Sequence, residues 1–218
     1  MDNIYYFSIP LLLQFLDLFG VMVFAVTGAL KAIQYKMDMV GVIVLASSTG
    51  LAGGLIRDLL LDRLPPKIIL DPYYLTIAVA TGVIVFFLHP FFKEREELFL
   101  KFDAIGLGVF TIIGASLAYE MLGLNFLAMS LAGIFTAIGG GIVRDVFVKE
   151  IPLVFIKELY ASASFVGIII FFILLYFGFN YYVSMIVCIV IITLFRLLAM
   201  KYNWNLPTKS YLGKERHR

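Results

Sequence analysis

Two Arg-Asp pairs lie inside otherwise apolar stretches of the chain, Arg57-Asp58 and Arg144-Asp145. A charged side chain at bilayer depth costs about 2.5–3.5 kcal/mol on insertion scales, so it is usually paired or turned toward water. These four residues are therefore the leading candidates to line an ion pathway. The alternative is that they snorkel at helix ends and set the topology. Adjacent helical residues point about 100° apart, so we expect Arg57 not to pair with Asp58.

Tandem glycines precede each charged pair, as Gly53-Gly54 and Gly139-Gly140-Gly141. Unsatisfied backbone groups are costly in hydrocarbon, so a helix loosened by glycine must be sheltered by protein or line a wet cavity. We expect these glycines to kink their helices and to mark a conduction or binding site. The alternative is that they only let neighbouring helices approach closely.

Hydroxyl side chains precede the glycines on the same segments, at Ser47, Ser48, Thr49 and Thr136. Their oxygens could replace part of an ion's hydration shell. They could equally donate back to the preceding helical turn. The sequence leaves both interpretations open.

Four further charges are secondary candidates or anchors. Asp17 and Asp103 occupy matching positions, where a carboxylate favours the positive end of a helix; Asp103 is expected at the interface and Asp17 deeper. Lys157 remains an undecided candidate for the ion pathway. Arg196 is predicted to be an interfacial anchor rather than a pore residue.

Enzyme chemistry has little support in the sequence. His89 and His217 are the only histidines, and Cys188 is the only cysteine. Since no nucleophile-and-base set, metal-ligand spacing or phosphate-binding loop stands out, we expect no enzyme activity, no cofactor and no tightly bound metal.

The composition indicates a protein of the lipid bilayer. The 218 residues are 62% hydrophobic and 15% charged, with a mean hydropathy of +1.00, whereas soluble domains are about 25% charged. A spanning helix needs about 20 apolar residues. Seven stretches qualify: Leu11–Ala32, Met39–Leu61, Pro72–Phe92, Phe102–Leu122, Phe126–Val148, Leu153–Phe177 and Tyr181–Met200.

The chain matches itself in two places. At an offset of 86 residues, Asp17, Gly20, Phe24, Gly28 and Ala29 match Asp103, Gly106, Phe110, Gly114 and Ala115. At an offset of 87, Thr49, Gly53, Gly54, Arg57, Asp58 and Pro65 match Thr136, Gly140, Gly141, Arg144, Asp145 and Pro152. Polar and glycine identities of this kind indicate a duplication.

The predicted architecture is all-α, a single transmembrane domain over residues 1–218. Each repeat, 11–92 and 102–178, contains three spans, so the second must enter from the opposite face and the repeats are inverted. A seventh helix, 181–200, and a basic tail, 201–218, follow.

Lys and Arg residues set the predicted orientation. With the loops assigned alternately, 14 of the 17 fall on one side and only Arg57, Arg63 and Lys67 on the other. The positive-inside rule then gives an outside N-terminus and a cytoplasmic C-terminus. Because no Lys or Arg precedes the first span, we expect no cleaved signal. The tail is predicted to touch anionic lipid rather than nucleic acid.

The two Gly-Gly-x-x-Arg-Asp segments, Gly53–Asp58 and Gly140–Asp145, within seven spans, resemble the bacterial relatives of the trimeric intracellular cation (TRIC) channels. The chain also resembles bacterial proteins grouped under a glycine-transporter domain. The resemblance covers nearly the whole chain. It implies a homotrimer in a prokaryotic plasma (inner) membrane, with one pore per subunit between two glycine-kinked helices, permeable to monovalent cations, chiefly K⁺. The Lys-Glu-Val segment linked to lipid binding in animal channels is missing near Gly53, so phosphoinositide regulation is not expected.

The functional hypothesis is a passive cation channel in which Asp58 and Asp145 favour cations, while Arg57 and Arg144 are paired or act as barriers. The alternative is a secondary transporter of a small zwitterion such as glycine. A third hypothesis is a trimeric membrane scaffold without flux.

Overall fold

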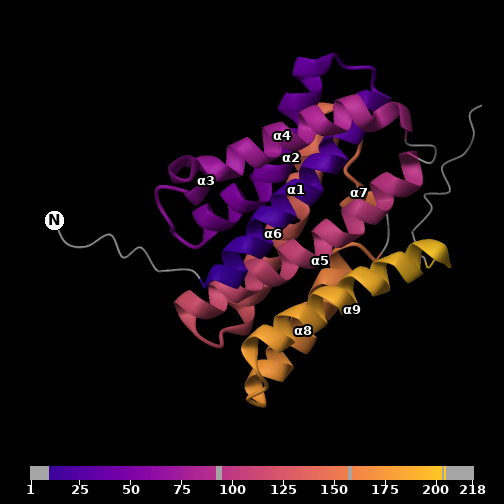
Figure 1. Cartoon of the computed structure of the whole chain (residues 1–218). Coiled ribbons are helices and arrows are strands. Elements are labelled where there is room, and N and C mark those ends of the chain that lie inside the picture. Colours follow the sequence, from indigo (N-terminus) through magenta and orange to yellow (C-terminus); the bar gives the residue numbers. More distant parts are fainter. Residues whose placement is uncertain (1–9, 92–94, 157–158, 203, 205–218) are drawn as a thin grey trace, which may run out of the picture.

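The computed structural model describes residues 10–91, 95–156, 159–202 and 204 (Figure 1). Every regular element of these residues is a helix. The bounds are α1 Leu11–Gln34, α2 Met39–Leu60, α3 Lys67–Leu70, α4 Pro72–Leu88, the short 3-10 helix η1 His89–Phe91, α5 Arg95–Leu122, α6 Phe126–Phe147, α7 Leu153–Ile156, α8 Ala161–Tyr176 and α9 Tyr181–Lys201.

Side-chain caps fix where several of these helices begin. The carboxylate of Asp38 accepts a hydrogen bond from the Gly41 amide at 2.7 Å, and the Asn125 amide oxygen accepts one from Ala128 at 3.1 Å. Each cap satisfies one of the amides that the first turn of a helix leaves unpaired. Asp38 and Asn125 thus start α2 and α6 in the same way.

Four helices form the centre of the molecule: α1, α2, α5 and α6 pack pairwise on one another. In Figure 1, α4 lies on the side of α1 and α2, and α8 and α9 lie on the side of α5. Large apolar side chains such as Leu11, Phe87 and Val183 point outward and are more than half exposed. An apolar exterior of this extent suits contact with lipid tails.

Among the described residues, five helices are long and apolar enough to cross a membrane: α1, α2, residues 96–122 of α5, α6 and α9. Two of the seven predicted spans are shorter in the structure, because α4 has 17 residues and α8 has 16. The protein is an all-helical membrane protein with these five membrane-length helices.

Two predicted boundaries are wrong. Helix α5 begins at Arg95 rather than at Phe102, because the polar first turn carries Glu96 and Glu97, which suit a helix N-terminus but not a hydropathy search. The predicted helix Leu153–Phe177 divides into α7 and α8, since Leu159 adopts a left-handed conformation (φ 61°) that a right-handed helix excludes.

Candidate functional site

Helices α2 and α6 cross in direct backbone contact. A Cβ placed on Gly53 would collide with the carbonyl oxygen of Thr136, and one on Gly140 would collide with that of Thr49. Residue numbers rise along one helix while they fall along the other, so the two helices run antiparallel through the crossing. Their Arg-Asp pairs therefore lie at opposite ends, each roughly 9 Å along its helix from the crossing.

The glycines do not interrupt either helix. Both α2 and α6 are continuous α-helices through their glycines. Close approach, the alternative interpretation, describes the contacts of Gly53 and Gly140, and the expected kink stays a prediction. Gly139 packs on the Ile56 side chain, whose Cδ1 lies 2.6 Å from the Cβ position.

The hydroxyls mostly donate back along their own helices. Thr49 donates to Leu45 O at 2.6 Å and Thr136 to Ala132 O at 2.5 Å, both fully buried. Ser48 likewise donates to Val44 O at 2.7 Å. The Ser47 hydroxyl has no hydrogen-bond partner among the described residues.

Two phenylalanines fill the space at the centre of the four helices α1, α2, α5 and α6. Phe24 and Phe110 are fully buried and pack edge to face, with ring centroids 5.1 Å apart. Phe110 lies over Gly20, and Phe24 lies over Gly106, so a Cβ at either glycine would meet a ring. Matching residues of the two halves thus exchange equivalent contacts.

The first charge cluster joins α1, α2 and α4. Arg57 Nη1 donates to Asp17 Oδ1 at 2.8 Å, and Arg57 Nε donates to Asp58 Oδ1 at 3.0 Å. The Tyr74 hydroxyl donates to Asp17 Oδ2 at 2.8 Å. All four side chains are at most 3% exposed, so each buried charge has an opposite charge within hydrogen-bond distance.

The loop after α2 completes the partners of Asp58. Its Oδ2 accepts from the backbone amide of Lys67 at 2.9 Å, and its Oδ1 lies 3.3 Å from Arg63 Nη1. The carboxylate therefore fixes the chain that leaves α2 as well as the arginine beside it.

The second charge cluster repeats the first. Arg144 Nη1 donates to Asp103 Oδ1 at 2.8 Å, and Arg144 Nε donates to Asp145 Oδ1 at 2.8 Å. Asp145 Oδ2 accepts from the Leu153 amide at 2.9 Å. Arg144 also donates to the Thr27 hydroxyl of α1 at 3.0 Å, which links the two halves.

Several predicted contacts are corrected by these clusters. Arg57 does pair with Asp58, because the arginine side chain is long enough for its Nε to fold back beside the next residue. Asp17 and Asp103 are not caps: each lies more than one turn inside its helix, is buried and holds an arginine. Arg196 is only 2% exposed and so is not an interfacial anchor. Lys157 and the tail from residue 205 lie outside the described residues.

Sequence reasoning missed Tyr74 and Tyr160. They lie 86 residues apart, the same offset as Asp17 and Asp103, so a longer self-alignment would have found them. The guanidinium carbon of Arg196, from α9, lies 4.9 Å from the Tyr160 ring centroid. The Tyr160 hydroxyl interacts with Asp103, as Tyr74 does with Asp17, but makes no hydrogen bond of ordinary geometry among the described residues.

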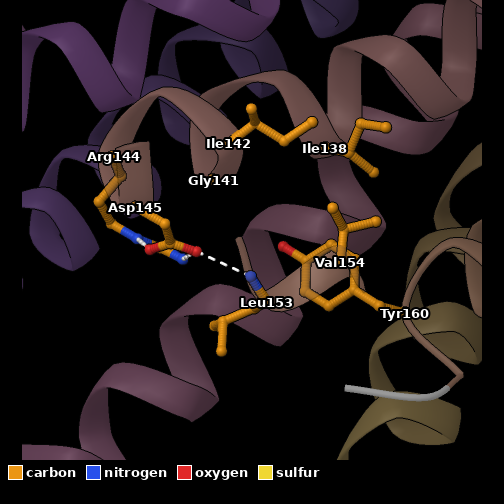
Figure 2. A pocket seen from close by; sticks show the side chains of 8 residues that line it. All are labelled: Ile138, Gly141, Ile142, Arg144, Asp145, Leu153, Val154 and Tyr160. Atoms are coloured by element: carbon orange, nitrogen blue, oxygen red, sulfur yellow. Dashed lines mark hydrogen bonds and ion pairs between the residues drawn. The ribbon is translucent and has the colours of Figure 1, made fainter. Parts of the chain in front are cut away.

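A recess of about 140 Å³ borders the second cluster and holds no space for a water-sized sphere. Figure 2 shows Arg144 and Asp145 on one side of it and Tyr160 and Val154 on the other. The Tyr160 hydroxyl lies 3.5 Å from the Cβ position of Gly141. The Tyr160 side chain thus closes the space beside the cluster.

A further contact ties α1 to the loop after α6. Lys31 Nζ lies 2.6 Å from Glu150 Oε2, and the Tyr35 hydroxyl donates to the other oxygen. Partial burial would raise the pKa of Glu150, but the hydrogen bonds from Lys31 and Tyr35 outweigh it and lower the pKa. The same hydrogen bond raises the pKa of Tyr35. The centroid of the Phe99 ring lies 5.6 Å from Lys31 Nζ and 4.6 Å from the guanidinium carbon of Arg144.

Known proteins are similar to this chain over most of its length. The family model described as "Glycine transporter" matches residues 14–90 and again residues 100–176. The UPF0126 inner membrane protein YadS of Escherichia coli is 35% identical over 200 residues, which cover 91% of this chain and 96% of YadS. The chain belongs to this family. Another relative, UPF0126 membrane protein YvgT of Bacillus subtilis, is 34% identical over the same shares.

Solved structures extend the comparison. A TRIC channel orthologue from Rhodobacter sphaeroides superposes with a TM-score of 0.85 at 32% identity, covering 89% of this chain and 100% of that one. A structure described as explaining conductance through TRIC cation channels gives 0.81 at 37% identity, covering 92% and 98%. The chain is thus a bacterial member of the TRIC superfamily.

Proposed function

We propose that the protein is a passive channel for monovalent cations, chiefly K⁺, in the inner membrane of a bacterium. The observation that carries the proposal is the pair of buried Asp-Arg-Asp clusters at opposite ends of the α2–α6 crossing. It is supported by similar solved structures, which are described as cation channels.

Charge gives the clusters their selectivity. Each triad of two carboxylates and one guanidinium is net negative by itself, although Arg63, 3.3 Å from Asp58, offsets this charge in the first cluster. A ring or cluster of negative charge near a narrow path favours cations over anions. The proposed cation-attracting groups are Asp58 and Asp145. The proposed barriers to cations are Arg57 and Arg144, each of which is ion-paired with both carboxylates of its triad.

The ion path would run along α2 and α6, past Thr49, Thr136 and the glycines. Phe24 and Phe110 are fully buried at the centre of the described conformation, so in this proposal the path is closed there. Opening would require the two helices to separate at Gly53 and Gly140, where each glycine meets a carbonyl oxygen of the other helix and a phenylalanine ring.

The proposed assembly is a homotrimer with a pore in each subunit. The proposed topology has seven spans as two inverted repeats and a last helix, with the N-terminus outside. The antiparallel crossing of α2 and α6 supports the inversion, since matching helices of inverted repeats must run in opposite directions.

Single-channel recording of the purified protein in a planar bilayer under a KCl gradient tests the proposal. We expect discrete steps that reverse near the K⁺ equilibrium potential. Asp145→Asn should move the reversal potential toward zero, because one carboxylate of the second triad loses its charge. Asp71→Asn, at a partly buried helix cap of α4 outside both clusters, is the matched control and should leave the recordings unchanged.

Two outcomes contradict the channel. Saturable glycine uptake into liposomes without single-channel steps would make the protein a transporter, as the family's description suggests. Absence of any flux from a correctly assembled protein would leave a structural role.

A further inference from the structure

Each charge cluster has a tyrosine with a cation over its ring, but the two cations have different origins. Lys67 Nζ lies 5.5 Å from the ring centroid of Tyr74, and Arg196 lies 4.9 Å from that of Tyr160. A cation at this distance from a ring face is attracted by the ring quadrupole. The two tyrosines thus have equivalent partners.

The second repeat does not supply its own cation at this place. The position that matches Lys67, at the offset of 86 that relates Tyr74 to Tyr160, is Leu153. Arg196 instead comes from α9, which lies outside both repeats. The last helix therefore provides what α3 provides in the first half.

Close packing holds α9 in the register that this contact needs. The Ile192 side chain fills the space where Gly167 of α8 lacks a Cβ, and Thr193 Oγ1 lies 2.5 Å from the Cβ position of Gly108 in α5. Arg196 follows one turn later on the same helix. The contacts of Ile192 and Thr193 therefore fix the position of α9 and place the Arg196 guanidinium beside Tyr160.

The two tyrosines also differ in how firmly they are held. Tyr74 donates a hydrogen bond of 2.8 Å to Asp17, whereas the Tyr160 hydroxyl points into the recess beside Gly141 and interacts with Asp103 without a hydrogen bond of ordinary geometry (Figure 2). The contact with Arg196 lies on the ring face of Tyr160, while Asp103 faces its hydroxyl, so the cation is one of two polar groups that hold the ring in place.

We propose that Arg196 is a positioning residue that holds Tyr160 in the recess and so keeps the second half of the ion path closed. The proposal rests on the channel function for its physiological meaning, but the geometry it invokes is independent of flux. Loss of the cation lets the ring leave the recess, and the space beside Asp145 opens.

The test exchanges the source of the cation. Arg196→Met should raise the open probability about tenfold without changing the conductance of a single open channel. Leu153→Lys, added to Arg196→Met, places an ammonium group at the position that Lys67 occupies in the first half and should return the open probability to the wild-type value. Arg196→Lys should stay near wild type. Lys201→Met, which removes a cation from the exposed Tyr202 ring on the same helix, is the control.

A second readout needs no ion flux. In a Cys188→Ala background, a cysteine at Ile142, which lines the recess, is labelled with a small thiol reagent in detergent. Arg196→Met should raise the labelling rate, and Leu153→Lys should lower it again. Unchanged labelling in Arg196→Met, or failure of Leu153→Lys to reverse the change, overturns the role of Arg196. If the wild type carries no current while labelling behaves as described, the channel function fails and the positioning role stands.

Discussion

A guanidinium buried in a membrane protein needs its partners. Arg57 and Arg144 are among the largest fully buried side chains of the described residues, and each touches two carboxylates. Removing one partner of a buried ion pair leaves an uncompensated charge and is far more costly than removing a surface pair. The clusters therefore constrain folding as well as any ion path.

Asp17→Asn should lower the free energy of unfolding by about 3–5 kcal/mol, because Arg57 loses one of its two charged partners and Tyr74 loses a charged acceptor. Unfolding by SDS in mixed micelles gives this free energy. Asp38→Asn is the control, because Asn caps a helix about as well as Asp. A loss no larger than in this control would show that the pair contributes little.

Tyr74→Phe and Tyr160→Phe should differ. The first removes a buried hydrogen bond to a charged acceptor and should cost about 1.5–3 kcal/mol. The second removes a hydroxyl that interacts with Asp103 without a hydrogen bond of ordinary geometry and should cost less. The same SDS titration measures both. Equal losses would mean that the Tyr160 hydroxyl is bonded as firmly as that of Tyr74.

The sequence located these residues but not their contacts. Asp17, Arg57 and their matches stood out because charges are rare in apolar segments, and duplication marked them a second time. Which carboxylate meets which guanidinium depends on helix register and side-chain conformation, which the spacing along one chain does not contain. The two tyrosines were passed over because aromatic residues are common throughout membrane helices.

Between helices, the crossing of α2 and α6 depends on particular glycines rather than on all of them. Gly53 and Gly140 touch the opposite backbone, whereas the nearest atoms to the Cβ positions of Gly54 and Gly141 are 3.7 and 3.5 Å away and belong to side chains. The first glycine of each Gly-Gly pair thus permits close helix contact, while the second lies against side chains only.

Gly53→Ala and Gly140→Ala should each destabilise the protein by about 1–3 kcal/mol or more, because a methyl group meets a carbonyl oxygen that belongs to another helix. Gly54→Ala and Gly141→Ala should stay within about 1 kcal/mol of wild type. Thermal unfolding in detergent ranks the four variants. If all four variants lost the same stability, close approach would not explain why both halves carry the same Gly-Gly-x-x-Arg-Asp spacing.

The loop after α6 should respond to pH through Glu150. Its lowered pKa means that the contact with Lys31 and Tyr35 stabilises the fold above the ordinary glutamate value of 4.5 and is lost as the pH falls through the lowered pKa. Thermal unfolding between pH 7 and pH 3 should show this loss, and Glu150→Gln should remove that part of the pH dependence. The same profile in wild type and Glu150→Gln would rule out the contact as its source.

Helix positions were more predictable than helix ends. An apolar run follows the cap at Asp38 and another follows the cap at Asn125. The bounds of α2 and α6 therefore agree with the prediction to within a residue. The start of α5 was missed because the residues before Lys101 are polar yet helix-forming, and the break before α8 was missed because the segment stays apolar on both sides of Lys157-Glu158.

For the whole molecule, the distribution of Lys and Arg predicts that the turn between α5 and α6 faces outward and the end of α1 faces the cytoplasm. In a Cys188→Ala background, Leu124→Cys should react with an impermeant maleimide on intact spheroplasts. Gln34→Cys should react only after lysis. If Gln34→Cys reacted on intact spheroplasts and Leu124→Cys only after lysis, the predicted topology would be wrong, and Asp58 would lie near the opposite side of the membrane.

The centre of the molecule is a seam whose two sides carry matching residues. Phe24 rests on Gly106 as Phe110 rests on Gly20, and Thr49 meets Gly140 as Thr136 meets Gly53. Reciprocal contacts of this kind are isologous, the pattern of a symmetric homodimer. A half-length chain with either set of residues would present a self-complementary face, and two such chains inserted in opposite directions would rebuild the seam without the linker between them.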